Sequence, residues 1–222
     1  MELKKKTSWR DVSINEYFDL TEKLSDESLK EYDKIVIKLA FVNNTTEDEI
    51  WSMNINDFRR LQVEALWLDS FDIPKDIKFN NITIDGEKYN VDTNLQNFSV
   101  AQYIDFQTFY PKYKKDNRVL GNILACFIIP AGKQYADGYD IQDLVRKINE
   151  NIDILTAEEI MFFFLKQYLL SMRVIANYFN WQMKKATKKM KNKDKIKQIE
   201  KEWEQTKKNI LIGLRSLTTS AN

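Results

Sequence analysis

The longest apolar stretch of the chain runs from Thr156 to Trp181 and reads TAEEIMFFFLKQYLLSMRVIANYFNW. Thr156 and Glu159 have the spacing of a capping box, which predicts a helix beginning at Ala157. Beyond its first turn this helix has one narrow, strongly polar strip. We therefore expect most of its surface to be covered, either by its own domain or by neighbouring subunits. The polar strip consists of Lys166, Arg173, Asn177 and Asn180.

Part of this stretch, Ile160–Trp181, is long enough to be considered as a membrane-spanning helix. Lys166 and Arg173 interrupt it, and each costs about 2.5–3.5 kcal/mol at the centre of a bilayer. A buried helix of a protein core or of an oligomer is therefore the preferred interpretation, and no membrane partner is expected.

The region before Pro74 carries repeated signals for the start of a helix. Ser13 with Glu16 and Thr46 with Glu49 have capping-box spacing, and Pro74 closes the region. The predicted helices run from Ser13 through Leu20, from Leu29 to Val42, from Thr46 over a short stretch, and from Asn54 or Asn56 through DFRRLQVEALWLD, whose expected buried face is Phe58, Leu61, Leu66 and Trp67.

Residues 77–93 change to the alternating pattern of strands. Asp85-Gly86 lies at the centre, and this dipeptide suits the positive φ angles of a two-residue turn. Residues 80–92 are thus predicted to form the only β-hairpin of the chain. An isolated hairpin is marginally stable, so we expect it to lie on the helices or to extend a sheet of a neighbouring subunit. Its apolar positions are Ile82, Ile84, Tyr89 and Val91.

Three more helices are predicted between the hairpin and the apolar stretch. Ser99 and Gln102 form a capping box ahead of VAQYIDFQTFY, which Pro111 is expected to stop. The second helix is NRVLGNILACFII, ending before Pro130, and the third is IQDLVRKINE, capped by Asp140. Residues 131–140 between them carry the strongest loop signal of the chain.

The last part of the chain combines many lysines with an apolar seam. A break is predicted around residues 191–194, followed by a helix of coiled-coil type. The resulting fold class is mostly α: a helical bundle with one small β-hairpin and a long C-terminal helical hairpin. Residues 1–183 form the predicted body and residues 184–222 a basic arm. The seam consists of Ile196, Ile199, Trp203, Ile210, Leu214 and Leu217.

The net charge of +1 conceals an uneven distribution. Between Lys184 and Lys208 there are 11 lysines against four acidic residues, a net charge of +7. Without that segment and Arg215 the chain has 22 basic and 29 acidic residues, a net charge of −7. An acidic body therefore carries a basic arm, a combination that suits head-to-tail packing between copies of the chain.

The residue types needed for most enzyme chemistry are scarce. The chain has no histidine, which excludes Ser-His and Cys-His nucleophile pairs, and its five glycines do not form a phosphate-binding loop. Its one cysteine, Cys126, excludes an intrachain disulfide, fits a reducing cytoplasm, and lies in an apolar run where a packed core thiol is expected. We expect no catalytic residue, no cofactor and no metal ion.

Two acidic features have a structural interpretation. Glu47, Asp48 and Glu49 crowd the predicted start of a helix, where negative charge complements the helix dipole. This interpretation is preferred to a cation site. Asp105 lies among aromatic and apolar residues, and we expect its carboxylate to accept a hydrogen bond from a neighbouring hydroxyl group.

The basic arm is the candidate interaction site. It is interpreted as a solvated or subunit-facing helix, in which the apolar seam contacts another chain. The alternative is contact with a nucleic acid, in which lysines neutralise phosphates and Trp181 or Trp203 stacks on bases. The candidate residues are Lys184, Lys185, Lys188, Lys189, Lys191, Trp181, Trp203, Ile196, Ile199 and Ile210.

Four segments of the chain are distinctive: TSWRDVSINEYFDL, ITIDGEKYNVD, FSVAQYIDFQTF and ILACFIIPAGKQYADGYDI. Together they resemble small structural proteins of tailed bacteriophages, of the kind found in phages of Bacteroidetes and Firmicutes, including the crAss-like group. The resemblance covers roughly residues 7–165 and leaves the basic arm outside.

This resemblance implies a non-enzymatic role in the virion or in tail assembly, in a particle assembled in the host cytoplasm. The leading expectation is a head–tail connector, a ring or a tail component that forms a homo-oligomer and contacts other phage structural proteins. A tail-assembly chaperone absent from the mature particle is the first alternative. A protein that contacts DNA through the basic arm is the second.

Overall fold

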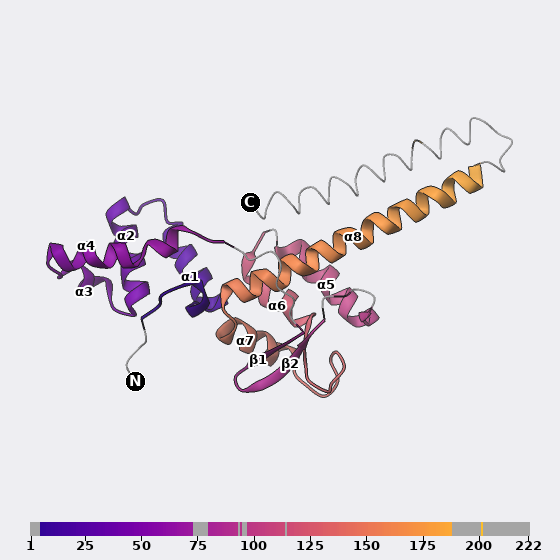
Figure 1. Ribbon diagram of the computed structural model, residues 1–222, viewed down its shortest axis with the longest axis horizontal. Helices are drawn as coiled ribbons and strands as arrows, with labels where there is room; N and C mark the ends of the chain where they lie inside the picture. The colour runs from indigo at the N-terminus through magenta and orange to yellow at the C-terminus, as the bar shows by residue number, and fades with distance from the viewer. Residues whose placement is uncertain are drawn as a thin grey trace. The chain divides into compact units, whose positions relative to one another are not determined.

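The computed structural model describes residues 5–72, 80–92, 94, 97–113, 115–187 and 201 (Figure 1). The chain folds as two compact units, Met1–Phe164 and Leu165–Asn222. Eight α-helices and one three-stranded antiparallel sheet lie in the described part of the chain, which confirms the predicted mostly α fold with a small β element. The division into a body and an arm at residue 183 stays a prediction.

Three of the four N-terminal helices begin at the caps that the sequence predicts, whereas the second begins at Glu31, two residues after the predicted Leu29. The side chains of Ser13 and Thr46 accept hydrogen bonds from the backbone N–H groups of Glu16 and Glu49, and Asn54 caps the fourth helix. These local caps decide where three of the four helices begin, because the second has no side-chain cap hydrogen bond. The elements are a 3-10 turn at Trp9–Asp11, α1 (Ile14–Leu24), α2 (Glu31–Asn43), α3 (Glu47–Trp51), α4 (Ile55–Glu64) and a second 3-10 turn at Leu66–Asp69.

The predicted buried face of the fourth helix is wrong at one position. Leu61 is buried as expected, but Leu66 is 61% exposed, and Ala65 and Leu68 are buried instead. The α-helix ends at Glu64 and the chain continues as a tighter 3-10 turn. A 3-10 turn has about 3.0 residues per turn rather than 3.6, so the buried positions shift relative to an unbroken α-helix.

The sheet contains the predicted hairpin and a third strand. Strands β1 (Asn81–Ile84) and β2 (Glu87–Val91) pair around Asp85 (φ 51°) and Gly86 (φ 77°), as the turn residues predict. Strand β3 (Ile128–Pro130) pairs with β2, so the hairpin is not the only β-structure of the chain. The predicted helix NRVLGNILACFII is shorter, because α6 spans only Leu120–Ala125. A short apolar run such as FIIP has no periodicity that separates a buried strand from a helix.

The hairpin turn depends on glycine at one position. Gly86 has a positive φ angle and nothing near the place of a Cβ atom, so an added methyl group meets no neighbour and only the backbone conformation is penalised. Gly86→Ala is expected to lower the free energy of unfolding by about 1–2 kcal/mol, measured by urea denaturation. Asp85→Gly keeps the turn geometry and is the matched control. Equal stability of Gly86→Ala and the wild type would contradict this geometry.

The later helices begin or end a few residues away from the predicted positions. The first, α5 (Val100–Tyr113), continues past Pro111, because proline close to the end of a helix removes only one backbone hydrogen bond. Helix α7 spans Ile141–Asn151 and is capped by Asp140 as predicted. The apolar helix α8 (Ile154–Thr187) begins three residues before Ala157. Asp153 is its cap, because its carboxylate accepts hydrogen bonds from the Thr156 N–H (2.9 Å) and hydroxyl (2.7 Å) groups.

An aromatic cluster forms the centre of the core next to the beginning of α8. The rings of Phe127 and Phe164 stack with centroids 4.1 Å apart, and Phe106 meets Phe164 edge to face at 4.8 Å. Phe106, Phe127 and Phe164 are fully buried, whereas Phe163 is only partly buried. The covering expected for the apolar helix is thus present over its first turns, Ile154–Phe164.

The N-terminal segment is joined to the start of α8 by backbone pairing. The Ile14 N–H group donates to the Ile152 carbonyl oxygen (3.2 Å), and the Ile154 N–H group donates to the Val12 carbonyl oxygen (2.9 Å). Ser13 and Asp153 form an isolated antiparallel bridge between these two hydrogen bonds. This pairing connects the N-terminal helices to the sheet-containing part of the first unit and brings the neighbouring residue Arg10 to α8.

Candidate functional site: polar clusters and exposed apolar faces

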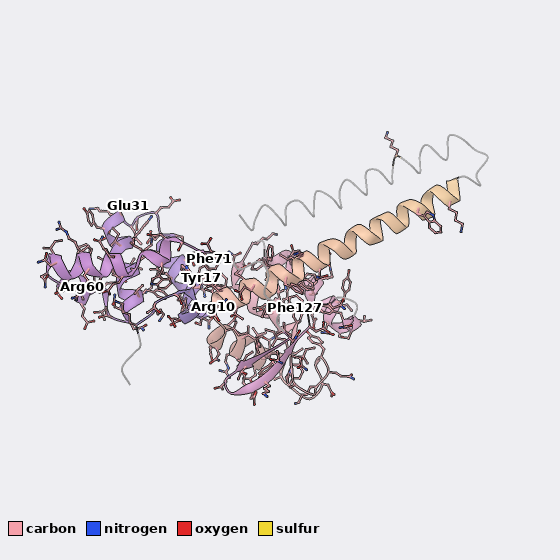
Figure 2. The ribbon with its side chains drawn as sticks, in the orientation of Figure 1. Arg10, Tyr17, Glu31, Arg60, Phe71 and Phe127 are labelled. Atoms are coloured by element: carbon pink, nitrogen blue, oxygen red, sulfur yellow. The ribbon has the colours of Figure 1, made fainter. Side chains whose placement is uncertain are left out.

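The first polar cluster lies where the N-terminal segment meets α8. The Arg10 guanidinium group lies beside the beginning of α8 (Figure 2) and donates to Asp153 (3.3 Å), to the Thr156 hydroxyl oxygen (2.6 Å) and to the Glu159 carboxylate. Glu159 is only 2% exposed. Burial lowers the pKa of Arg10, but the hydrogen bonds and charges of Glu159 and Asp153 outweigh it and hold this pKa above its ordinary value. The cluster is a structural ion pair that fixes the N-terminal segment.

The second polar cluster surrounds Cys126. The Tyr135 hydroxyl group donates to Asp105 (2.7 Å). A hydroxyl partner for this carboxylate was expected, but the sequence did not identify Tyr135 as that partner. The Gln102 side chain donates to the Cys126 carbonyl oxygen (3.1 Å), and burial raises the pKa of the Cys126 thiol to about 12. A thiol with this pKa is neutral at physiological pH, so Cys126 is the packed core residue that was expected.

The third polar feature is the carboxyl group of Glu158, which interacts with two tyrosine side chains. Glu158 on α8 is partly buried and accepts a hydrogen bond from the Tyr113 hydroxyl group (3.3 Å). Burial raises the pKa of Tyr17 on α1, and the charge of Glu158 raises it further. Burial raises the pKa of Glu158 although the hydrogen bond from Tyr113 lowers it. Protonation of Glu158 therefore favours the folded state.

The raised pKa of Glu158 makes stability depend on pH. Its stabilising contribution is fully present below the unfolded-state pKa of about 4.3 and is lost as the pH rises through the higher folded-state pKa. Glu158→Gln is therefore expected to unfold at a higher urea concentration than the wild type at pH 8 and at an equal one at pH 4. Glu27→Gln changes an exposed carboxylate and is the control. A difference at pH 4 as large as that at pH 8 would contradict the burial of Glu158.

The described residues contain no group of side chains that could hold a metal ion. Across residues 5–72, 80–92, 97–113 and 115–187, no three Cys, Asp or Glu side chains lie close enough together to hold a cation. The acidic run Glu47–Glu49 occupies the first turn of α3, where the Glu49 carboxylate accepts a hydrogen bond from the Thr46 N–H group (3.0 Å). This run is the helix start that the sequence predicts.

Apolar side chains are exposed on one side of α5. Val100, Tyr103 and Ile104 are 77%, 46% and 57% exposed, and their spacing places them on one face of the helix. Gln102 and Phe106 on the opposite face are buried. We call Val100, Tyr103 and Ile104 the outer face of α5. It contains no charged residue, which is unusual for a helix surface exposed to water.

Five more exposed apolar residues lie on α3, on α4, and in the segments that follow each of these helices. Trp51 at the end of α3 is 56% exposed. Met53 and Ile55, which follow it along the chain, are exposed as well. Ile55 and Val63 lie two turns apart on one side of α4. We call this region the α3–α4 surface, and it consists of Trp51 (56%), Met53 (36%), Ile55 (58%), Val63 (68%) and Leu66 (61%).

Part of the predicted lysine site is described. Trp181 in α8 is 55% exposed, and the Lys185 ammonium group lies 5.0 Å from the centre of its ring. Lys184 lies in the same helix. The other residues predicted for this site lie outside the described residues: Lys188, Lys189, Lys191, Ile196, Ile199, Trp203 and Ile210.

No helix in the described part of the chain has the length and hydropathy needed to cross a membrane.

Sequence reasoning missed both exposed apolar faces. A signal for the outer face of α5 is present, because apolar residues in VAQYIDF occupy both sides of the helical wheel. On α4, Ile55 and Val63 share one side of the helix while Leu61 occupies the other. Apolar residues on two sides of a helix are kept from water only if other elements pack on both sides, and in α4 and α5 the described residues leave one side exposed.

Comparison with known protein families, with characterised proteins and with solved structures found no match for this chain.

Proposed function

We propose that this chain is a non-enzymatic structural protein of a tailed-bacteriophage particle, a head–tail connector, ring or tail component that acts through contacts between subunits. The resemblance of residues 7–165 to phage structural proteins supports this proposal. The interactions of its polar clusters also support it, because Arg10, Asp105 and Glu158 all have partners within the first unit.

The observation that carries the proposal is the exposure of large apolar side chains on two regions of the first unit. Val100, Val63 and Leu66 are the most exposed of these residues, and Trp51 and Ile104 are also more than half exposed. Single exposed apolar residues are common, but a whole uncharged helix face on the surface marks a protein interface. Tryptophan, tyrosine and methionine are also the residue types that protein interfaces favour.

Mass spectrometry of purified phage particles tests this role. A virion component is expected in particles in a constant ratio to the other structural proteins, after density-gradient purification and protease treatment. A tail-assembly chaperone is instead expected in infected-cell lysate and absent from particles. Absence from particles would therefore overturn the structural role and favour the chaperone.

Contact with DNA is the second candidate function, and the exposed Trp181 beside Lys185 is the observation that favours it. An exposed aromatic ring among lysines suits stacking on bases combined with contacts to phosphates. On this hypothesis, affinity for single-stranded DNA falls steeply with salt.

The salt dependence is measurable by titration at several salt concentrations. Lys184→Glu with Lys185→Glu is expected to reduce the slope of log affinity against log salt by about 1.4, because each lost phosphate contact in single strands contributes about 0.7. Lys23→Glu with Lys133→Glu, which changes two exposed lysines elsewhere, is the matched control. Binding that is indifferent to salt and to the lysine substitutions would end the DNA hypothesis.

A further inference from the structure

We infer that the α3–α4 surface binds the basic arm, residues 184–222, of a second copy of this chain. This inference rests on the proposed function, since it names the contact through which a structural subunit associates with the next. It selects one of the two exposed apolar regions as the receiving surface.

The α3–α4 surface and the basic arm both carry large apolar residues. The α3–α4 surface presents Trp51, Ile55 and Val63, all more than half exposed. The arm carries an apolar seam that includes Ile196, Ile199 and Trp203, whose spacings of three and four residues repeat at the helical period. Burying two such apolar surfaces against each other removes both from water.

The charges of the two partners are opposite. Residues 1–72 contain 16 acidic and 10 basic residues, a net charge of −6, so most of the negative charge of the body lies in the region of α1–α4. Between Lys184 and Lys208 the net charge is +7. Opposite net charges steer two surfaces together and exclude other pairings.

The carboxylates next to Trp51 are available to lysines of the arm. Glu47 and Asp48 lie one turn before Trp51 on α3, and both are exposed. Neither carboxylate forms an ion pair with a residue in the described part of the chain. Among the described residues, no lysine or arginine side chain neutralises these two negative charges.

The local charge argues against the outer face of α5 as the receiving surface. Residues 97–118, which contain α5, have two acidic and four basic residues, a net charge of +2. A basic arm is repelled there. A contact between the α3–α4 surface of one copy and the arm of another joins two different surfaces, so it repeats head to tail and closes a ring or extends along an axis.

A charge-exchange experiment on the full chain tests the inference. One variant reverses the acceptor charges, Glu47→Lys with Asp48→Lys, and the other reverses arm charges, Lys188→Glu with Lys189→Glu. Each variant alone is expected to associate on the order of tenfold more weakly than the wild type in analytical ultracentrifugation at low salt. An equimolar mixture of the two variants is expected to regain association, because opposite charges face each other again in mixed contacts. Glu27→Lys with Glu31→Lys makes the same charge change on other exposed residues and is the control.

Three outcomes would overturn the inference. The first is association unaffected by the acceptor variant but lost in Tyr103→Gln with Ile104→Gln, which would move the contact to the outer face of α5. The second is a wild-type chain that stays monomeric at all concentrations. The third is a mixture that associates no better than its two components. The composition of purified particles tests the proposed function separately, so a protein found in particles keeps its structural role even if this contact is wrong.

Discussion

Arg10→Met is expected to destabilise the first unit by about 3 kcal/mol, the lower end of the range for breaking a buried ion pair. Glu159 is 2% exposed, and without Arg10 its carboxylate is left buried with no cation beside it. The lower end applies because the Arg10 side chain is 40% exposed and part of its charge is solvated. The Oε2 atom of the Glu159 carboxylate has no hydrogen-bond partner among the described residues, so no second interaction there compensates for the loss.

The double variant Arg10→Met with Glu159→Met separates this cause from a loss of packing. Replacing both members of a buried ion pair by apolar residues is often neutral or stabilising, so the double variant is expected to recover most of the lost stability. Urea denaturation followed by near-ultraviolet circular dichroism measures the stability of the single and the double variant. Arg118→Met, which breaks an exposed ion pair with Asp19 and Glu22, is the control and is expected to change the midpoint little. A double variant less stable than Arg10→Met would show that the carboxylate is not the source of the loss.

Phe164→Ala is expected to lower the free energy of unfolding by about 3–5 kcal/mol, the range for removing a buried aromatic ring. Phe164 is fully buried and contacts Phe127 and Phe106 with ring centroids 4.1 Å and 4.8 Å away. Removing it leaves a cavity that these two rings cannot fill without leaving their own positions. Phe164→Asp is expected to prevent folding of the first unit, because it also buries a carboxylate that has no partner.

The adjacent residue is the matched control for this prediction. Phe163 has the same side chain in the same helix but is only partly buried. Phe163→Ala is therefore expected to cost clearly less than Phe164→Ala in the same denaturation experiment. Equal losses at the two positions, or a larger loss at Phe163, would mean that the face of α8 turned toward the core has been assigned wrongly.

Most helix starts were predictable from the sequence because capping is local. Ser13, Thr46 and Asn54 bond to backbone N–H groups two or three residues away, whatever the rest of the chain does. The hairpin turn was predictable for the same reason, since Asp85-Gly86 tolerates positive φ angles that other residues disfavour.

Two differences from the predictions depend on residues far away in the sequence. Thr156 and Glu159 have capping-box spacing, but Asp153 takes the cap and Glu159 pairs with Arg10, 149 residues away. The run after Cys126 becomes strand β3 because β2 presents a free edge for backbone hydrogen bonds.

The sequence by itself determined the mostly α fold class, the places where most helices begin, the hairpin turn, and the division into acidic and basic regions. These follow from interactions within a few residues or from composition. Only the tertiary structure decided which apolar residues lie inside, Phe164 and Phe127, and which remain outside, Trp51, Val63 and Ile104. Helical periodicity identifies the apolar sides of a helix, but whether an apolar side is covered depends on which other elements pack against it, and that is a property of the folded chain.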